Sequence, residues 1–327
     1  MVLFFGIAAA EITQSCLPGG DLYPIRQALN PLLATLGGVA GPALVYFLLN
    51  RLCGSPALAN GWGIPTATDI ALSWLMARLV FGNNHPAISY LLLLAIVDDG
   101  IGLAIIAIFY PDPAHPVLPI WLLLTGLGMV AAYLLRHGKA RSYWPYLLVG
   151  GILSWLGLYL AHLHPALALV FIVPFLPHAR RGEKRLFVED PRVRSTIANF
   201  VQDWKVVVDF GLFMFGLANA GVVFAEVAPV TFLVLGALLL GKTGGVFCGG
   251  CLGVLLGYPL PAHMGRRELF VTGIVAAIGF TVALFVAGEA FTDSALQGAA
   301  KMGAAMSIGA AAVAWLAARL MRIPRIK

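Results

Sequence analysis

Long runs of apolar residues are the feature that most constrains this chain. Most of these runs last about 20 residues, and only short polar stretches separate them. A backbone in lipid must satisfy its own hydrogen bonds, so only helices and closed β-barrels span a membrane. Barrel strands would alternate apolar and polar residues, and these runs do not. We therefore predict an all-α polytopic membrane protein with about ten full transmembrane segments, at approximately 27–53, 62–81, 86–110, 117–135, 143–162, 164–177, 206–224, 229–257, 269–290 and 296–320.

The composition agrees with a chain that lies almost wholly in lipid. Sixty per cent of the 327 residues are hydrophobic and 11% are charged, which is too little polar surface for a water-soluble globule. The net charge of +6 does not indicate a nucleic-acid partner, because the basic residues form short clusters between apolar runs. We expect one transmembrane domain over 1–327, with 178–205 as its one sizeable cytoplasmic loop and the lipid bilayer as its partner.

Basic residues fall mainly on one side of the predicted membrane. When successive loops are assigned to alternate sides, 18 of the 21 lysines and arginines share one side. Cytoplasmic loops of membrane proteins carry such an excess. We therefore expect a protein of the bacterial inner membrane with a cytoplasmic carboxyl terminus. The loops expected on the same side are Arg136–Arg141, Arg180–Lys205 and Arg266–Arg267.

The first residues do not read as a signal peptide. Met1–Ala10 is apolar, lacks a preceding basic region and is interrupted by Glu11. About ten apolar residues cannot cross a bilayer core of about 30 Å. We expect a partial first segment, the second half of a membrane helix whose beginning is missing from the sequence.

Cys248 and Cys251 form a C-x-x-C pattern inside an apolar run. Such a pair can bind a metal or undergo redox chemistry, but no second pair or histidine partner follows it. The two glycines between the cysteines favour close helix packing instead. We predict no cofactor.

Two adjacent aspartates, Asp98 and Asp99, occupy the centre of the segment 86–110. A charge in hydrocarbon costs several kcal/mol unless it is paired or hydrated, so such residues indicate a function. Two carboxyl groups this close together can hold a proton that a cation displaces, and carboxylate oxygens are hard cation ligands. We predict a site for a metal cation and protons at this pair. The alternative is a permanently protonated pair that only joins helices.

Two further ionisable residues lie deep in apolar runs. Lys242 is the one cation at a depth comparable to the aspartates; an ammonium group facing Asp98 would stay charged and neutralise it. Asp69 follows the stretch 63–68, which contains glycine and proline and forms a helix poorly. We expect an interrupted helix there, because unwound backbone at membrane depth is tolerated where it lines a cavity.

A second interruption is expected at Gly279 and Thr281, within the segment 269–290. Each interruption falls in the middle segment of a triplet, one over 27–110 and the other over 229–320. The positions of the basic residues indicate that the two triplets begin on opposite faces of the membrane. Such an inverted repeat is typical of transporters, whose sites lie where broken helices meet.

The chain resembles the NhaA-type sodium/proton antiporters over nearly its whole length. The most specific matches are TATDIA around Asp69, AIVDDGIGLAIIAIFY around Asp98, FGLANAGV at 215–222, LLGKTGG around Lys242 and GIVAAIGFTVALFVA at 273–287. The resemblance implies an inverted-repeat transporter whose two interrupted helices cross at the membrane midplane.

Position by position, the resemblance implies that Asp99 is the main cation ligand and Asp98 the second essential carboxylate. Lys242 corresponds to the lysine that pairs with Asp98. Asp69 corresponds to the aspartate that compensates exposed helix ends at the crossing, and Thr68 helps to shape the site. The ions bound there would be Na⁺ or Li⁺ and protons.

Two departures from the family pattern concern assembly and regulation. The family's first helix and the following loop, which make the dimer contact, are absent, so we expect a weakened homodimer. Glu11 matches a glutamate of the family's pH-responsive region, but the next family glutamate, one turn later, is Ser15 here. The loop 178–205 is only loosely similar.

The sequence thus predicts a secondary active antiporter that exports Na⁺ or Li⁺ against entering protons by alternating access, for sodium and pH homeostasis. The alternative is a sodium-coupled organic-anion symporter, which would need a polar substrate pocket. An intramembrane aspartyl protease is disfavoured, because its two aspartates would lie on different helices. We expect a transporter and no enzyme.

Overall fold

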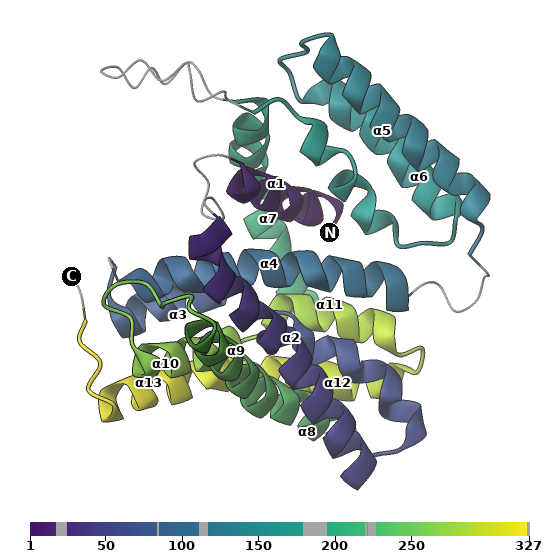
Figure 1. The fold of residues 1–327 in the computed structure, drawn as a ribbon. Coiled ribbons are helices and arrows are strands. Elements are labelled where there is room, and N and C mark those ends of the chain that lie inside the picture. The colour runs from purple at the N-terminus through teal and green to yellow at the C-terminus, as the bar shows by residue number, and fades with distance from the viewer. Residues whose placement is uncertain are drawn as a thin grey trace, which may run out of the picture. The chain divides into compact units, whose positions relative to one another are not determined.

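The computed structural model describes residues 1–17, 25–83, 85–110, 117–178, 195–219, 221 and 227–325, and the side chains of these ranges except those of 25–27. Within these ranges the chain is helical and has no strand (Figure 1). The predicted all-α class is therefore confirmed. Most of the predicted cytoplasmic loop, residues 179–194, lies outside the described residues.

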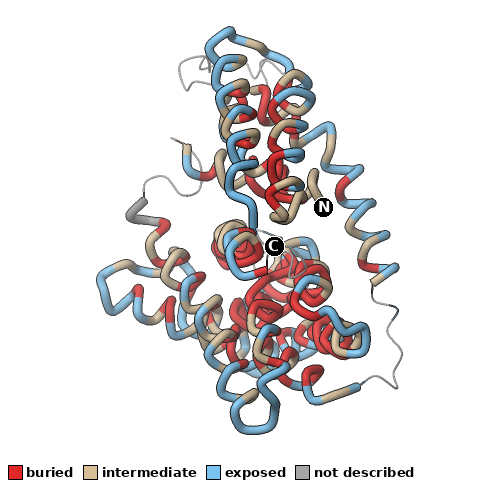
Figure 2. The backbone as a smooth tube through the Cα atoms, turned by 90° about the vertical axis from the view of Figure 1, so that its right-hand side faces the viewer, coloured by how far each residue is buried: buried red, intermediate tan, exposed pale blue. Residues whose placement is uncertain are grey.

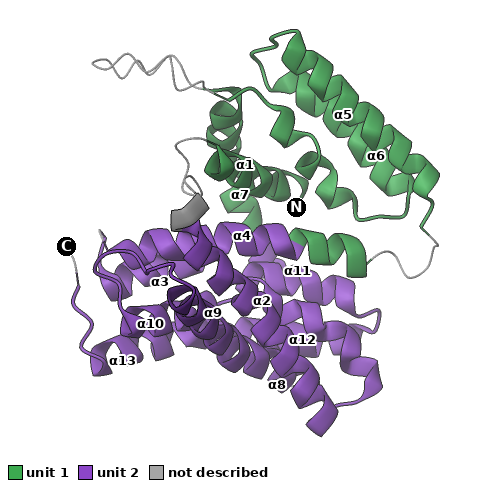
Figure 3. Cartoon of the chain, viewed as in Figure 1, with its two compact units in different colours: residues 1–20, 103–212 green, residues 21–102, 213–327 purple. Residues whose placement is uncertain are grey.

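Contacts within the chain divide it into two compact units (Figure 3). Unit 1 comprises Met1–Gly20 and Leu103–Leu212, and unit 2 comprises Asp21–Gly102 and Phe213–Lys327. The expectation of one domain over 1–327 stays a prediction.

Unit 1 is built from short helices and parts of two long ones. They are α1 (Val2–Cys16), the second part of α4 (Pro86–Phe109), η2 (Pro119–Trp121), α5 (Leu122–His137), η3 (Tyr146–Gly151), α6 (Ile152–Leu160), η4 (Pro165–Val170), η5 (Val173–Phe175) and the first part of α7 (Thr196–Asn219).

Unit 2 contains both predicted repeats, apart from the second part of α4. Its first repeat holds α2 (Ile25–Cys53), η1 (Pro56–Thr66), α3 (Ile70–Phe81) and the first part of α4. Its second holds α8 (Pro229–Gly236), η7 (Ala237–Lys242), α9 (Thr243–Leu255), α10 (Arg266–Ala276), α11 (Phe280–Ala290), α12 (Ser294–Met306), η8 (Ser307–Gly309) and α13 (Ala310–Leu320).

Several helices are long and apolar enough to cross a membrane. Among the described residues there are five, and two bent pairs would raise the number to seven. The bent pairs are η1 with α3, at 56°, and α10 with α11, at 48°. Both bends occur at the predicted interruptions. The remaining predicted segments contain shorter or less apolar helices, so the count of ten stays a prediction.

A glycine seam brings α2 and α9 into backbone contact (Figure 1). A Cβ atom added to Gly245 would lie 2.0 Å from the carbonyl oxygen of Gly37, and one added to Gly249 would lie 2.3 Å from that of Leu33. Only glycine fits at such distances, and small residues four apart are typical of helix contacts in membranes. Gly249 is one of the two glycines between the cysteines, in agreement with the packing interpretation. The seam consists of Gly241, Gly245, Gly249 and Gly253.

Buried residues gather inside each unit, while the outer turns of the helices are exposed (Figure 2). Many of the exposed side chains are large and apolar, such as Leu44, Leu52 and Leu255. A soluble protein rarely exposes apolar patches on this scale. Lipid is therefore the solvent that suits these outer faces.

His85 caps the beginning of α4, the helix that carries the aspartate pair. Its ring Nδ1 accepts a hydrogen bond from the backbone N–H of Ala87 at 3.1 Å, and its ring stacks on Phe81 at a centroid distance of 5.0 Å. Burial lowers the pKa of His85 below its usual 6.5; nearby Glu268 opposes this shift and His263 adds to it. Only the neutral ring has a free Nδ1 acceptor, so the cap requires neutral His85.

We predict that acidification destabilises the protein partly through His85. Folding lowers the pKa of His85. The stabilisation that neutral His85 contributes is therefore complete above about pH 6.5 and decreases as the pH falls below that value. The asparagine side chain of His85→Asn can still cap the helix, which stabilises the helix by about 1 kcal/mol, but this side chain does not titrate. The melting temperature should therefore fall less between about pH 8 and about pH 5 in this variant than in the wild type.

The control is His263→Asn, because His263 is exposed and has a φ of 64° that asparagine tolerates. This variant should keep most of the pH dependence of the wild type. Identical pH slopes for His85→Asn and the wild type would contradict the assignment.

Candidate cation site

The start of α3 satisfies the carbonyl groups left open where α10 ends. A helix that stops inside a protein leaves its last carbonyl oxygens without partners. Residues at the other interruption supply donors for three of these oxygens: Thr68 Oγ1 to Ala276 at 2.9 Å, Ser73 Oγ to Val275 at 3.1 Å and the backbone N–H of Asp69 to Ile278 at 2.7 Å. The two interrupted helices therefore join at their breaks.

Asp69 caps two helices with one carboxylate group. Its Oδ1 accepts from the backbone N–H of Leu72 in α3 at 3.0 Å, and its Oδ2 accepts from the backbone N–H and the hydroxyl of Thr281 in α11, at 3.0 and 2.7 Å. The side chain is buried. Helix N-termini carry partial positive charge, so one negative group here stabilises both.

Gly279 lies at the point where α10 and α11 separate. A Cβ atom on this residue would lie 3.0 Å from the carbonyl oxygen of Ala67 and 2.9 Å from a methyl carbon of Leu238, so the site has no room for a side chain. Its backbone N–H donates to the hydroxyl of Ser307 at 3.2 Å. Ser307 was not predicted from the sequence; a lone hydroxyl in an alanine- and glycine-rich segment was the available signal.

Lys242 lies at the junction of η7 and α9 and is fully buried. Its Nζ is 2.6 Å from Asp98 Oδ2, and neither side chain is exposed. Nζ also donates to the backbone carbonyl of Thr66, the last residue of η1. One ammonium group thus neutralises a carboxylate and the negative end of a half-helix. Thr66 is a further residue that the sequence analysis did not identify.

Asp98 and Asp99 are both buried near the middle of α4. Lys242 interacts electrostatically with both carboxyl groups. Thr68 also acts on Asp98 electrostatically, while its hydroxyl donates to the carbonyl oxygen of Ala276. The cluster therefore holds two carboxyl groups and one ammonium group, which is a chemistry suited to binding either a proton or a small cation.

The structure brings all but one of the predicted site residues together in unit 2. Asp98, Asp99 and Lys242 form the ionisable cluster, and Thr68 links it to the helix breaks described above.

Glu11 is the remaining predicted residue and belongs to α1 of unit 1. The charged groups that act on it are Lys205 and Asp209, both on α7 of the same unit.

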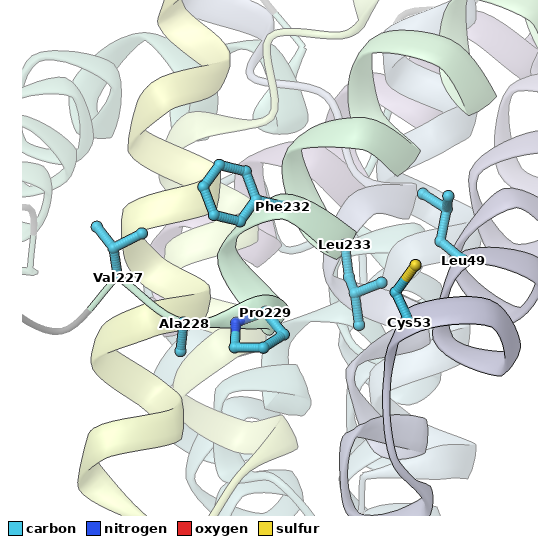
Figure 4. Close-up of a pocket in the computed structure, with 7 residues that line it drawn as sticks. All are labelled: Leu49, Cys53, Val227, Ala228, Pro229, Phe232 and Leu233. Atoms are coloured by element: carbon cyan, nitrogen blue, oxygen red, sulfur yellow. The ribbon is translucent and has the colours of Figure 1, made fainter.

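An apolar pocket of unit 2 is not a cation site. It has a volume of about 450 Å³ and lies between the end of α2 and the start of α8 (Figure 4). Its lining is apolar apart from the thiol of Cys53: Leu49, Cys53, Val227, Ala228, Pro229, Phe232 and Leu233. None of these side chains carries a carboxylate or carboxamide oxygen, which is the kind of ligand that a hard cation needs.

We predict that Asp69→Ala destabilises the protein by about 2 kcal/mol or more, because it removes the caps of two helices at about 1 kcal/mol each. Thr281→Val, which loses only the hydroxyl donor, should cost about 1 kcal/mol. Unfolding in detergent measures both effects. The control is Asp293→Ala, which removes the single, exposed cap of α12; a loss as large as that of Asp69→Ala would contradict the double cap.

Comparisons with known proteins identify the family of this chain. A family model described as Na⁺/H⁺ antiporter 1 matches residues 1–318. The Na(+)/H(+) antiporter NhaA 1 of Pelobacter propionicus is 68% identical over 326 residues, which cover 100% of this chain and 85% of that protein. NhaA of Geobacter metallireducens is 66% identical with the same coverage. NhaA of Jannaschia sp. is 42% identical over 348 residues, covering 99% and 82% of the two chains. These relatives are named as transporters, and the chain belongs to the NhaA-type Na⁺/H⁺ antiporter family.

Proposed function

We propose that this chain exchanges Na⁺ or Li⁺ for protons across a membrane, and that Asp98 and Asp99 form the site at which the ions compete. Family membership supports the exchange itself. The observation that carries the site assignment is the buried cluster of two carboxyl groups with one ammonium group at the helix crossing.

The charges of this cluster explain why it would take up one cation at a time. When both carboxyl groups are ionised, the single positive charge of Lys242 balances only one of the two negative charges. A remaining buried charge costs several kcal/mol. Binding of either one proton or one metal cation removes that cost, so the cluster does not need to bind both at once.

Asp99 is the residue at which this competition occurs. Asp98 makes the direct ion pair with Lys242 at 2.6 Å, so its charge is committed to holding the lysine. Asp99 lies on the same helix about 100° around the axis, and we assign the exchangeable ion to its carboxylate. Protons displace the cation when the site faces the acidic side, and the cation displaces the proton when it faces the cytoplasm.

An organic-anion symporter has no support from the comparisons. The relatives named above are antiporters by name. Exchange of inorganic ions remains the function that fits the cluster.

We predict that Asp99→Asn abolishes both cation binding and the proton release that accompanies it, because asparagine keeps the shape and removes the charge. Calorimetric titration with NaCl in buffers of different ionisation enthalpy measures both. The wild type should show a buffer-dependent heat and the variant none. Asp293→Asn, at an exposed helix cap, is the control and should behave as the wild type. Sodium binding with proton release by Asp99→Asn would refute the assignment.

The stability of the variants separates the roles of the two aspartates. Asp98→Asn breaks the buried ion pair and leaves the ammonium group poorly compensated, at a cost of about 3 to 5 kcal/mol. Asp99→Asn keeps that pair, so its melting temperature should fall less than that of Asp98→Asn. Equal losses in both variants would contradict the division of roles.

The same proposal includes a bacterial inner-membrane location with a cytoplasmic carboxyl terminus, supported by the excess of basic residues on one side. A fluorescent protein that folds only in the cytoplasm, fused after Lys327, should fluoresce. The same reporter fused after Ser55 should stay dark, because that loop is expected on the opposite side. The reverse pattern would overturn the orientation.

A further inference from the structure

A basic cleft lies at the end of α13, apart from the cation site. Its volume is about 370 Å³, and Val80 of α3 forms one wall. The end of α13 packs beside α3 and α10 in unit 2 (Figure 1). The lining residues are Val80, Trp315, Ala318, Arg319, Arg322, Ile323 and Arg325.

The backbone after α13 is ordered by specific contacts. Arg322 has a φ of 54°, and the N–H of Ile323 donates back to the carbonyl oxygen of Ala318 at 3.0 Å. Arg267 of α10 donates to the carbonyl oxygen of Met321 at 3.4 Å. The side chain of Ile323 packs against the core cluster that contains Val80. The arginines therefore extend from a folded turn.

The charges in the cleft are all of one sign. Three of the seven lining residues are arginines, and none of the seven is acidic. The guanidinium group of Arg319 lies 5.3 Å from the ring centroid of Trp315, a cation–π contact that orients it. Guanidinium groups bind phosphate oxygens through paired hydrogen bonds. An anion with phosphate oxygens would relieve the repulsion among the three arginines.

The apolar part of the cleft identifies the source of the phosphate. Val80, Trp315, Ala318 and Ile323 form this part. Trp315 is exposed, and so are its neighbours Leu316 and Leu320 on α13. In a membrane-spanning chain these side chains face acyl chains, and tryptophan is enriched at the level of the headgroups. A phosphate with attached acyl chains fits both parts of the cleft, whereas a free phosphate fits only one.

We propose that this cleft binds the headgroup of an anionic phospholipid. The phosphodiester lies among Arg319, Arg322 and Arg325, and the acyl chains follow the exposed apolar face of α13. Basic pockets at the cytoplasmic ends of membrane helices are suited to such headgroups. The bound lipid connects the end of α13 to α3, whose first turn is capped by Asp69.

The test measures lipid binding and thermal stability of the full chain in a neutral detergent. Phosphatidylglycerol is titrated against the protein, with phosphatidylcholine, inorganic phosphate and glycerol phosphate in parallel arms. Phosphatidylglycerol should raise the melting temperature of the wild type. The lipid should also stay bound to the wild type in native mass spectrometry. Phosphatidylcholine and the two water-soluble phosphates should have little effect. An equal gain with inorganic phosphate would overturn the lipid assignment.

Two variants locate the binding. Arg322→Gln/Arg325→Gln should weaken the apparent affinity for phosphatidylglycerol about thirtyfold. Arg322→Lys/Arg325→Lys keeps the charge and should lose less affinity for phosphatidylglycerol than the glutamine variant. Arg136→Gln is the matched control, because Arg136 also lies in the last turn of a membrane helix, α5, and outside the cleft. It should bind as the wild type does.

The melting temperature in neutral detergent alone shows whether each variant is folded. If the glutamine variant does not fold, the lysine variant decides the question, since it must still bind more weakly than the wild type. Unchanged affinity in a folded glutamine or lysine variant would overturn the proposal, as would an equal loss in Arg136→Gln.

Discussion

The fully buried ammonium group of Lys242 is the interaction on which the arrangement of unit 2 depends. An isolated ion in such a position costs several kcal/mol, and the cost is offset only when oxygen atoms surround it. Here a carboxylate of α4 and the last carbonyl group of η1 supply them. Three segments far apart in the chain must therefore meet at one point. Removing any one of them would leave a buried charge or a buried carbonyl group without its partner.

The helix crossing follows the same physical rule. Each break exposes carbonyl groups on one side and N–H groups on the other, and lipid offers neither donors nor acceptors. The start of α3 satisfies the end of α10, and Asp69 satisfies the beginnings of α3 and α11. The polar groups created by the breaks are thus partners of one another. This mutual compensation keeps irregular backbone beside the aspartates, where a cation needs access.

The glycine seam makes these contacts geometrically possible. Lys242 directly follows Gly241, and α9 approaches α2 so closely that a methyl group on Gly245 would overlap the backbone of Gly37. Apolar attraction between helices is weak in lipid, so close backbone packing contributes much of the association. The same packing positions the lysine against the half-helix end at Thr66. Stability and the proposed ion binding therefore depend on one set of helix contacts.

The sequence by itself determined the solvent, the class of the fold and the identity of the ionisable residues. Apolar runs of about 20 residues require helices in lipid, and charges such as Asp98 and Lys242 are too costly there to be incidental. The resemblance added the pairing of these two residues. The helix breaks at Asp69 and Gly279 could also be predicted from the sequence, because glycine and proline weaken helices locally.

Only the tertiary structure decided which donor meets which acceptor. Thr281 and Asp69, for example, are 212 positions apart. Helical periodicity determines which residues share a face over a few turns, but it carries no information on how distant helices cross. Ser307, the carbonyl group of Thr66 and the double cap by Asp69 depend on that crossing. Their roles therefore follow from packing in three dimensions, which brings together groups that the local sequence does not relate.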